Sequence, residues 1–201
     1  MALLLILLYY LVLLLLYYGD FMVVEVLRLG HRWGRDKRIS THVALTSRAL
    51  GADKILFVSN DDHVKDSVNR IVEQWGGDFK FDVVDSWKQY IWSFKKNNGI
   101  VIHLTMYGEN INEIMKKIIE KRQEGKDSKN ILIIIGAEKV PKEAYELADY
   151  NVSVGNQPHS EVAAIAILLD RLFEGSSLYK EYPDAKIKVN PSDRYKSVEI
   201  R

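Results

Sequence analysis

The chain has 201 residues, 47% of them hydrophobic, and a formal net charge of +1. This fits one domain with a sizeable core, and the net charge by itself points to neither nucleic acid nor a membrane surface. The absence of cysteine excludes disulfides, thiolate metal sites and a cysteine nucleophile, and it fits a reducing compartment. The five histidines form neither an HxxxH nor an HExxH pair, so no zinc site is predicted.

The first segment, residues 2–18, is an unbroken apolar and aromatic run. A spanning helix needs roughly 20 apolar residues, so this run is borderline, and it lacks the basic region and cleavage site of a signal peptide. One interpretation is a membrane anchor. The other, which we favour, is an upstream extension with Met22 as the true start. We therefore divide the chain into an apolar leader, residues 1–21, and one functional domain, residues 22–201. We expect a cytoplasmic protein with no obligatory membrane partner.

Strands and helices alternate from residue 23 onward. A strand at 23–27 is followed by a basic loop at 29–40. Thr41 and Gly51 have the residue types of a helix N-cap and a helix stop, so a helix is predicted at 41–50. The next predicted elements are a strand at 55–58, a helix capped by Ser59 or Asn60 and ended by Gly76 and Gly77, a strand at 81–84 and a helix at 86–96.

The second half continues the same pattern. Strands are predicted at 100–104 and 151–154, and an apolar stripe over 111–119 predicts a helix between them. Residues 131–135 are all aliphatic, which is typical of a central parallel strand buried on both faces. A helix at 160–173 has Ser160 as its N-cap, and a mixed, charged tail follows. The sequence therefore predicts an α/β domain with a mostly parallel sheet.

The loop near the N-terminus concentrates positive charge in a chain whose charges otherwise balance. Within 21 residues it holds one acid, Asp36, and six basic side chains: Arg28, Arg32, Arg35, Lys37, Arg38 and Arg48. Because guanidinium groups match phosphate geometry, this loop is a candidate nucleic-acid contact. Trp33 would stack on a base or pack on the sheet. The alternative is a solvated loop, or arginines paired with acids elsewhere in the fold.

Three predicted loops follow strands at the edge where parallel sheets bind ligands, at residues 104–108, 136–140 and 155–161. None contains a GxGxxG or GxxxxGK[ST] motif, so neither a Rossmann dinucleotide site nor a P-loop is supported. Gly136 and Gly155 directly follow strands and allow a flat ligand to approach the main chain. The alternative is that they only permit tight turns. His159, just before a helix, is either a donor to a ligand or a structural residue.

Taken together, these stretches resemble the archaeal tRNA (cytidine(56)-2'-O)-methyltransferase family of the knotted SPOUT superfamily. The resemblance covers nearly the whole chain outside the leader. It is carried by RLGHR at 28–32, RDKR at 35–38, THVALTSR at 41–48, HLTMYG at 103–108, GAEKVP at 136–141 and VGNQPHSEVAA at 154–164.

The resemblance implies a C-terminal deep trefoil knot and a bent S-adenosylmethionine within it. It implies that two such sites form at a homodimer interface. The cofactor contacts that it implies are Leu104, Gly136, Ala137, Glu138, Lys139, Val140, Val154, Gly155, Asn156, Gln157, Pro158, His159, Ser160 and Glu161. The RNA contacts then fall on Arg28, Arg32, Arg35, Lys37 and Arg38.

The same resemblance implies that Arg48 is the catalytic arginine of the first motif. We expect it to hold the adjacent phosphate and to stabilise the developing alkoxide, because arginine stays protonated and is a poor base. His42 and His159 stand where relatives in the wider group often have asparagine. The expected activity is 2'-O-methylation of cytidine 56 in tRNA. The alternatives are methylation of ribosomal RNA or of another tRNA position, or an RNA-binding protein of this fold without activity.

Overall fold

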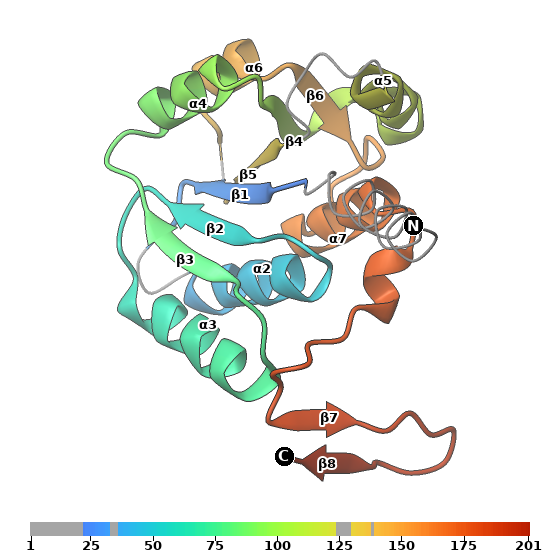
Figure 1. Ribbon diagram of the computed structural model, residues 1–201. Helices are drawn as coiled ribbons and strands as arrows, with labels where there is room; N and C mark the ends of the chain where they lie inside the picture. Colours follow the sequence, from blue (N-terminus) through green and yellow to red (C-terminus); the bar gives the residue numbers. More distant parts are fainter. Residues whose placement is uncertain (1–21, 33–35, 124–129, 138) are drawn as a thin grey trace, which may run out of the picture.

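A computed structural model describes residues 22–32, 36–123, 130–137 and 139–201 of the chain. Its centre is a six-stranded sheet in the order β3-β2-β1-β5-β4-β6, in which every pair of neighbours is parallel (Figure 1). The strands are β1 (Val24–Leu29), β2 (Lys54–Phe57), β3 (Lys80–Val83), β4 (Ile100–Asn110), β5 (Ile131–Gly136) and β6 (Tyr150–Ser153).

The aliphatic run predicted to be central is β5, which lies between β1 and β4. Its side chains alternate between the two cores: Ile131, Ile133 and Ile135 belong to one, and Leu132 and Ile134 to the other. All five are at most 2% exposed. A strand buried on both faces needs an apolar residue at every position, which explains why this run has no polar alternation.

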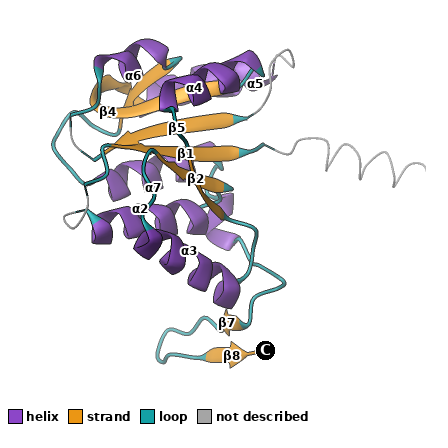
Figure 2. Cartoon of the chain, turned by 90° about the vertical axis from the view of Figure 1, so that its left-hand side faces the viewer, coloured by secondary structure: helices purple, strands orange, loops and turns teal. Residues whose placement is uncertain are grey.

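The helices cover both faces of the sheet (Figure 2). Those bordering the larger core are α2 (Lys37–Ala49), α3 (Asp62–Trp75), α5 (Ile111–Gln123) and α7 (Glu161–Leu172). Those bordering the second core are α4 (Trp87–Lys96) and α6 (Lys142–Leu147). The chain leaves β1 for α2 on one face and leaves the neighbouring β5 for α6 on the other. This reversal makes a topological switch point, where parallel α/β sheets bind ligands beyond the carboxyl ends of the strands.

The structure differs from the sequence-based expectation in several elements. Helix α3 is capped by Asp61, whose side chain accepts from Val64 N, and not by Ser59 or Asn60. Strand β4 runs to Asn110 and does not end at residue 104. Helix α2 begins at Lys37, four residues before the predicted N-cap Thr41, and the main-chain carbonyl of Asp36 accepts from Ser40 N at 2.8 Å. Helix α6 was missed because its six residues are too few to reveal a helical period. In the charged tail, a short 3-10 turn, η1 (Ser176–Tyr179), precedes an antiparallel hairpin of β7 (Ile187–Val189) and β8 (Val198–Ile200).

The predicted α/β class and parallel sheet are confirmed. The trefoil threading of the C-terminal segment stays a prediction. The leader, residues 1–21, lies outside the described residues. Within the described part of the chain, no helix combines the length and hydrophobicity that a membrane span requires.

Candidate cofactor and RNA site

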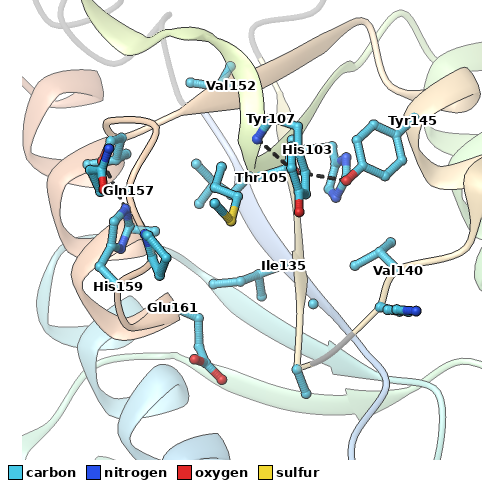
Figure 3. Close-up of a pocket in the computed structure, with 18 residues that line it drawn as sticks. His103, Thr105, Tyr107, Ile135, Val140, Tyr145, Val152, Gln157, His159 and Glu161 are labelled. Carbon is cyan, nitrogen blue, oxygen red and sulfur yellow. Dashed lines mark hydrogen bonds between the residues drawn. The ribbon is translucent and has the colours of Figure 1, made fainter.

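A cavity of about 600 Å³ opens at the carboxyl ends of β4, β5 and β6, beside the switch point (Figure 3). Loops from all three strands meet there, as the sequence predicted. The lining residues are His103, Leu104, Thr105, Met106, Tyr107, Ile135, Gly136, Ala137, Lys139, Val140, Tyr145, Val152, Val154, Gln157, Pro158, His159, Glu161 and Ala164. This volume is in the range of cavities that bury a nucleoside-sized ligand.

Most of the residues predicted to contact the cofactor line this cavity. They are Leu104, Gly136, Ala137, Lys139, Val140, Val154, Gln157, Pro158, His159 and Glu161. The loop after β6 also contains Gly155, Asn156 and Ser160, but these three residues do not line the cavity. Glu138 lies outside the described residues.

One wall of the cavity is an irregularity in β4. The register between β4 and β6 shifts between Leu104 and Glu109, so that both residues face Val152. Residues 105–107 therefore leave the ladder and line the cavity. Gly108 returns the chain to the sheet in close contact with the main chain of β6, where a Cβ would lie 2.5 Å from the carbonyl oxygen of Asn151.

Asn156 and Ser160 hold the third loop in place without lining the cavity. The Asn156 side-chain amide donates to the carbonyl of Met106 at 2.7 Å, which ties this loop to the irregular segment of β4. Ser160 Oγ accepts from Val162 N at 3.2 Å and confirms the predicted N-cap of α7. His159 Nε2 donates to the carbonyl of Val154 at 2.8 Å across the same loop. These bonds give the loop a defined shape before a ligand binds.

Helix α6 brings to the cavity a polar wall that sequence reasoning missed. Tyr145 Oη lies 2.9 Å from Thr105 Oγ1, and its ring meets the His103 ring edge-on at a centroid distance of 4.5 Å. His103 Nδ1 lies 2.9 Å from Asn151 Oδ1, while the amide nitrogen of Asn151 donates to the Tyr145 carbonyl. The amide orientation therefore makes Nδ1 the donor. Residue types alone do not reveal such a wall, because its members come from three separate elements.

The tautomer of His103 gives the cavity a candidate acceptor. Burial lowers the pKa of His103, which keeps the imidazole neutral near pH 7. With the proton on Nδ1, Nε2 carries a lone pair, and it is buried with no hydrogen-bond partner in the described part of the chain. A buried acceptor without a partner is costly, so a ligand donor at Nε2 would be stabilising.

The basic loop lies at the same edge of the sheet, because β1 ends beside β5, with Leu29 paired to Gly136. Arg32 donates to Asp36 through both its main-chain nitrogen and its Nε, at 3.0 and 2.9 Å, and Arg38 is exposed on the first turn of α2. Arg35 and the side chain of Lys37 lie outside the described part of the chain.

Arg28 corrects the sequence-based prediction of an RNA contact. It is 0% exposed, because its side chain points from β1 into the core beneath α2 and α7. Its guanidinium donates to Ser40 Oγ at 2.9 Å and to Glu161 Oε1 at 3.1 Å. A side chain enclosed in this way cannot reach a phosphate. Arg28 instead follows the alternative given above, in which an arginine of this region pairs with an acid elsewhere in the fold.

Arg48, the predicted catalytic arginine, lies far from the cavity of its own chain. It is at the C-terminal end of α2, about 15 Å along the helix axis from the first turn. Its Nη2 donates to the carbonyls of Trp75 and Gly76 at 2.9 and 2.5 Å, and its guanidinium lies 4.6 Å from the ring centre of Tyr182. The cavity is at the opposite end of the sheet. Within one chain, Arg48 therefore holds α3 and the C-terminal segment together.

We expect Arg48→Met to lower the free energy of unfolding by about 3 kcal/mol, because two carbonyls lose a charged donor. The dissociation constant for S-adenosylmethionine should stay within about twofold of the original, since the cavity is remote. Urea denaturation and calorimetry measure the two quantities. Arg171→Met on the exposed side of α7 is the matched control and should cost less than about 0.5 kcal/mol. Unchanged stability combined with lost methyl transfer would support the catalytic role predicted for Arg48.

A second prediction concerns acid stability at the basic loop. Hydrogen bonding from the Arg32 side chain lowers the pKa of Asp36 to about 2. The ionised pair therefore stabilises the fold above about pH 4, and this contribution is lost as the pH falls toward about 2. Asp36→Asn should be less stable than the original chain at neutral pH, and the difference should shrink in acid. Urea midpoints of both proteins, measured from neutral pH to about pH 2, test this prediction. A stability difference between them that stays constant with pH would contradict the stabilising role of the ionised pair.

A family model described as tRNA ribose 2'-O-methyltransferase, aTrm56, matches residues 75–199, which is more than half of the chain. The chain belongs to this family. The resemblance inferred from the motifs is thereby confirmed.

Several proteins named tRNA (cytidine(56)-2'-O)-methyltransferase are similar over almost their whole length. The protein of Methanococcus maripaludis strain C7 is 70% identical over 177 residues, covering 88% of this chain and 97% of that protein. The Methanocaldococcus jannaschii protein is 69% identical, with 85% and 93% covered. The Thermococcus kodakarensis protein is 54% identical, with 88% and 96% covered.

Solved structures share the fold of this aTrm56 member at low sequence identity. A crystal structure of an RNA 2'-O ribose methyltransferase matches with a TM-score of 0.56 at 14% identity, covering 77% of this chain and 57% of that one. The SpoU methyltransferase AviRb from Streptomyces viridochromogenes, solved with AdoMet, matches with a TM-score of 0.52 at 13% identity, covering 77% and 58%. The chain thus spans under two thirds of each of these structures, and the match concerns the fold.

Proposed function

We propose that this chain transfers the methyl group of S-adenosylmethionine to the ribose 2'-oxygen of cytidine 56 in tRNA. The observation that carries the proposal is the high identity, over nearly the full length of both chains, with enzymes of that name. The cavity supplies the structural support, because the three segments that the motifs single out meet at its walls.

The residues around the cavity suit S-adenosylmethionine. Apolar side chains such as Leu104, Ile135 and Val152 can enclose the adenine ring. Lys139 and Glu161 place opposite charges at the wall, which matches a ligand carrying a carboxylate, an ammonium and a sulfonium. The buried Nε2 of His103 offers an acceptor to an amino or hydroxyl donor.

The chemistry assigns the protein a positioning role. S-adenosylmethionine supplies a methyl group that its sulfonium charge has already activated. The residues that line the cavity would hold the cofactor in one orientation. The ribose must then enter from the open side in line with the methyl carbon.

The RNA side of the proposal rests on the basic loop. Arg32, whose side chain is 33% exposed, and Arg38 lie at the edge of the sheet that also carries the cavity. Both can contact phosphates that flank the target nucleotide, with Arg32 exchanging or sharing its bond to Asp36. We include Arg35 and Lys37 in this contact on the strength of the motif alone.

We further propose that the chain acts as a homodimer. The C-terminal hairpin stands apart from the main body of the domain in both views (Figures 1 and 2), and an isolated two-stranded hairpin is marginally stable in water. The apolar side chains exposed along this segment are Leu178, Tyr179, Val189, Tyr195, Val198 and Ile200. A second copy would cover them. Light scattering should give twice the mass of one chain, and a monomer that methylates tRNA would overturn this part.

The direct test incubates the protein with methyl-labelled S-adenosylmethionine and an unmodified tRNA transcript, and then maps the label. We expect one 2'-O-methyl group at cytidine 56. Label at another position, or only on ribosomal RNA, would support a different substrate. Binding of RNA with no heat on titration of S-adenosylmethionine would support the RNA-binding protein without activity.

A further inference from the structure

A continuous chain of hydrogen bonds runs beneath the sheet edge from the start of α3 to the cavity. Asp61 Oδ2 lies 2.8 Å from His31 Nε2, and His31 Nδ1 lies 2.8 Å from Ser40 Oγ. Arg28 Nε donates to the same Ser40 hydroxyl at 2.9 Å, and its Nη2 donates to Glu161 Oε1 at 3.1 Å. The five residues come from β1, the loop after it, α2, the N-cap of α3 and α7. We call them the buried relay.

Four members of the buried relay are enclosed, and only Glu161 reaches the cavity. The side chains of Arg28, His31 and Asp61 are 0%, 2% and 1% exposed, and Ser40 is 0% exposed, whereas the side chain of Glu161 is 23% exposed and lines the cavity. Burying several polar and charged groups is costly, and it rarely improves stability over an apolar core. Their presence behind Glu161, which lines the cavity, therefore calls for a role beyond packing.

Within the buried relay, Arg28 and Asp61 are both charged at neutral pH. Burial lowers the pKa of Arg28, and the hydrogen bond and charge of Glu161 raise it only in part, but arginine remains protonated at neutral pH. Burial raises the pKa of Asp61, yet the hydrogen bonds from His31 and from Val64 N outweigh it and leave the pKa below its usual value. The guanidinium is thus a permanent cation held in one place by partners on two sides.

The contact between Arg28 and Glu161 leaves the carboxylate available to a ligand. Between these two side chains, only Nη2 of Arg28 donates and only Oε1 of Glu161 accepts. Nη1 is buried without a partner in the described part of the chain. Oε2 of Glu161 is therefore not engaged by the guanidinium. Among the described residues that line the cavity, Glu161 is the one carboxylate.

We propose that Arg28 is a positioning residue that fixes the Glu161 carboxylate for hydrogen bonds from donor groups of the bound cofactor, and that Ser40, His31 and Asp61 fix Arg28. This inference rests on the proposed function, since it takes S-adenosylmethionine as the ligand. It replaces the RNA contact predicted for Arg28. A carboxylate on a helix N-terminus has several rotamers, and the guanidinium selects one before the cofactor arrives, which reduces the entropic cost of binding.

The test is a double-mutant cycle on cofactor affinity. Calorimetry with S-adenosylmethionine is done on the full chain and on Arg28→Met, Glu161→Gln and the double variant, with urea denaturation of each. We expect each single change to weaken binding about tenfold and the double change to weaken it by about the same factor, because Arg28 acts through Glu161. If Arg28 had a purely structural role, the two effects would be independent, and the double variant would bind the cofactor about a hundredfold more weakly.

Two further variants keep the test decisive. Arg48→Met removes another buried arginine at the far end of the sheet, and it should lose stability without losing cofactor affinity. If Arg28→Met does not fold, Ser40→Ala takes its place in the cycle, since it removes only the hydroxyl that links Arg28 to His31. We expect it to weaken binding about threefold in the original background and not at all beside Glu161→Gln.

The possible failures are distinguishable. If the unaltered chain gives no heat with S-adenosylmethionine, the proposed function itself is overturned. If the unaltered chain binds but Arg28→Met and Glu161→Gln bind equally well, the positioning role is overturned and the function stands. The positioning role is also overturned if the losses of affinity in the two single variants multiply in the double variant.

Discussion

Gly108→Ala is expected to abolish binding of S-adenosylmethionine and to lower the free energy of unfolding by about 3 kcal/mol or more. The added Cβ would lie 2.5 Å from the carbonyl oxygen of Asn151 and 2.6 Å from Val152 N. These are main-chain atoms of β6, so the overlap can be relieved only by moving the strands apart. Movement of residue 108 would also displace residues 105–107, which line the cavity. Urea denaturation and calorimetry measure the two losses.

Gly155→Ala is the matched control for this prediction. Gly155 is in a cavity loop too, but a Cβ there meets nothing within 4 Å, and the only penalty is its φ of 76°. A left-handed conformation costs an alanine about 1 kcal/mol, so a small loss of stability and retained binding are expected. Equal effects at positions 108 and 155 would show that the close approach of β4 to β6 is not what shapes the cavity.

A tRNA transcript with 2'-deoxycytidine at position 56 is expected to accept no methyl group at that position. The substitution removes only the nucleophile, while phosphate contacts, which dominate affinity, remain. We therefore expect binding within about threefold of the normal transcript and competitive inhibition of its methylation. Scintillation counting and mapping of the label measure methyl transfer and its inhibition, and filter binding measures the affinity for the transcript.

The control is a transcript with the deoxyribose at position 57, which should be methylated at the normal rate apart from small effects on loop shape. Label that persists on the transcript modified at position 56 would mean that the methyl group goes to a base or to another ribose. Loss of both binding and methylation would mean that the 2'-hydroxyl is a recognition element, and the deoxy transcript would then not inhibit.

Several parts of this molecule were predictable from local patterns. The aliphatic run that became β5 needs no partner to be recognised as a strand buried on both faces. Ser160 has the residue type and position of an N-cap, and its hydroxyl does accept from Val162 N. The three loops were expected to meet because carboxyl ends of parallel strands share one edge of a sheet. Those features depend on residues close in sequence and on general rules of topology.

Local sequence patterns could not predict the polar wall or the buried relay. His103 meets Tyr145 only because α6, a helix of six residues, packs over the end of β4. Arg28 and Glu161 are 133 positions apart. Sequence spacing predicts which face of its own element a side chain occupies, but not which distant element will cover that face.

The two arginines make the division clear. The sequence by itself determined that Arg28 and Arg48 bring positive charge close to a loop with further basic residues, and the motifs around them determined the family. Only the tertiary structure decided their surroundings: α7 places a carboxylate against Arg28, and the end of α3 places two carbonyls against Arg48. A guanidinium has the same charge and donors in every setting, so whether it meets phosphate, carboxylate or main chain depends on the long-range packing that encloses it.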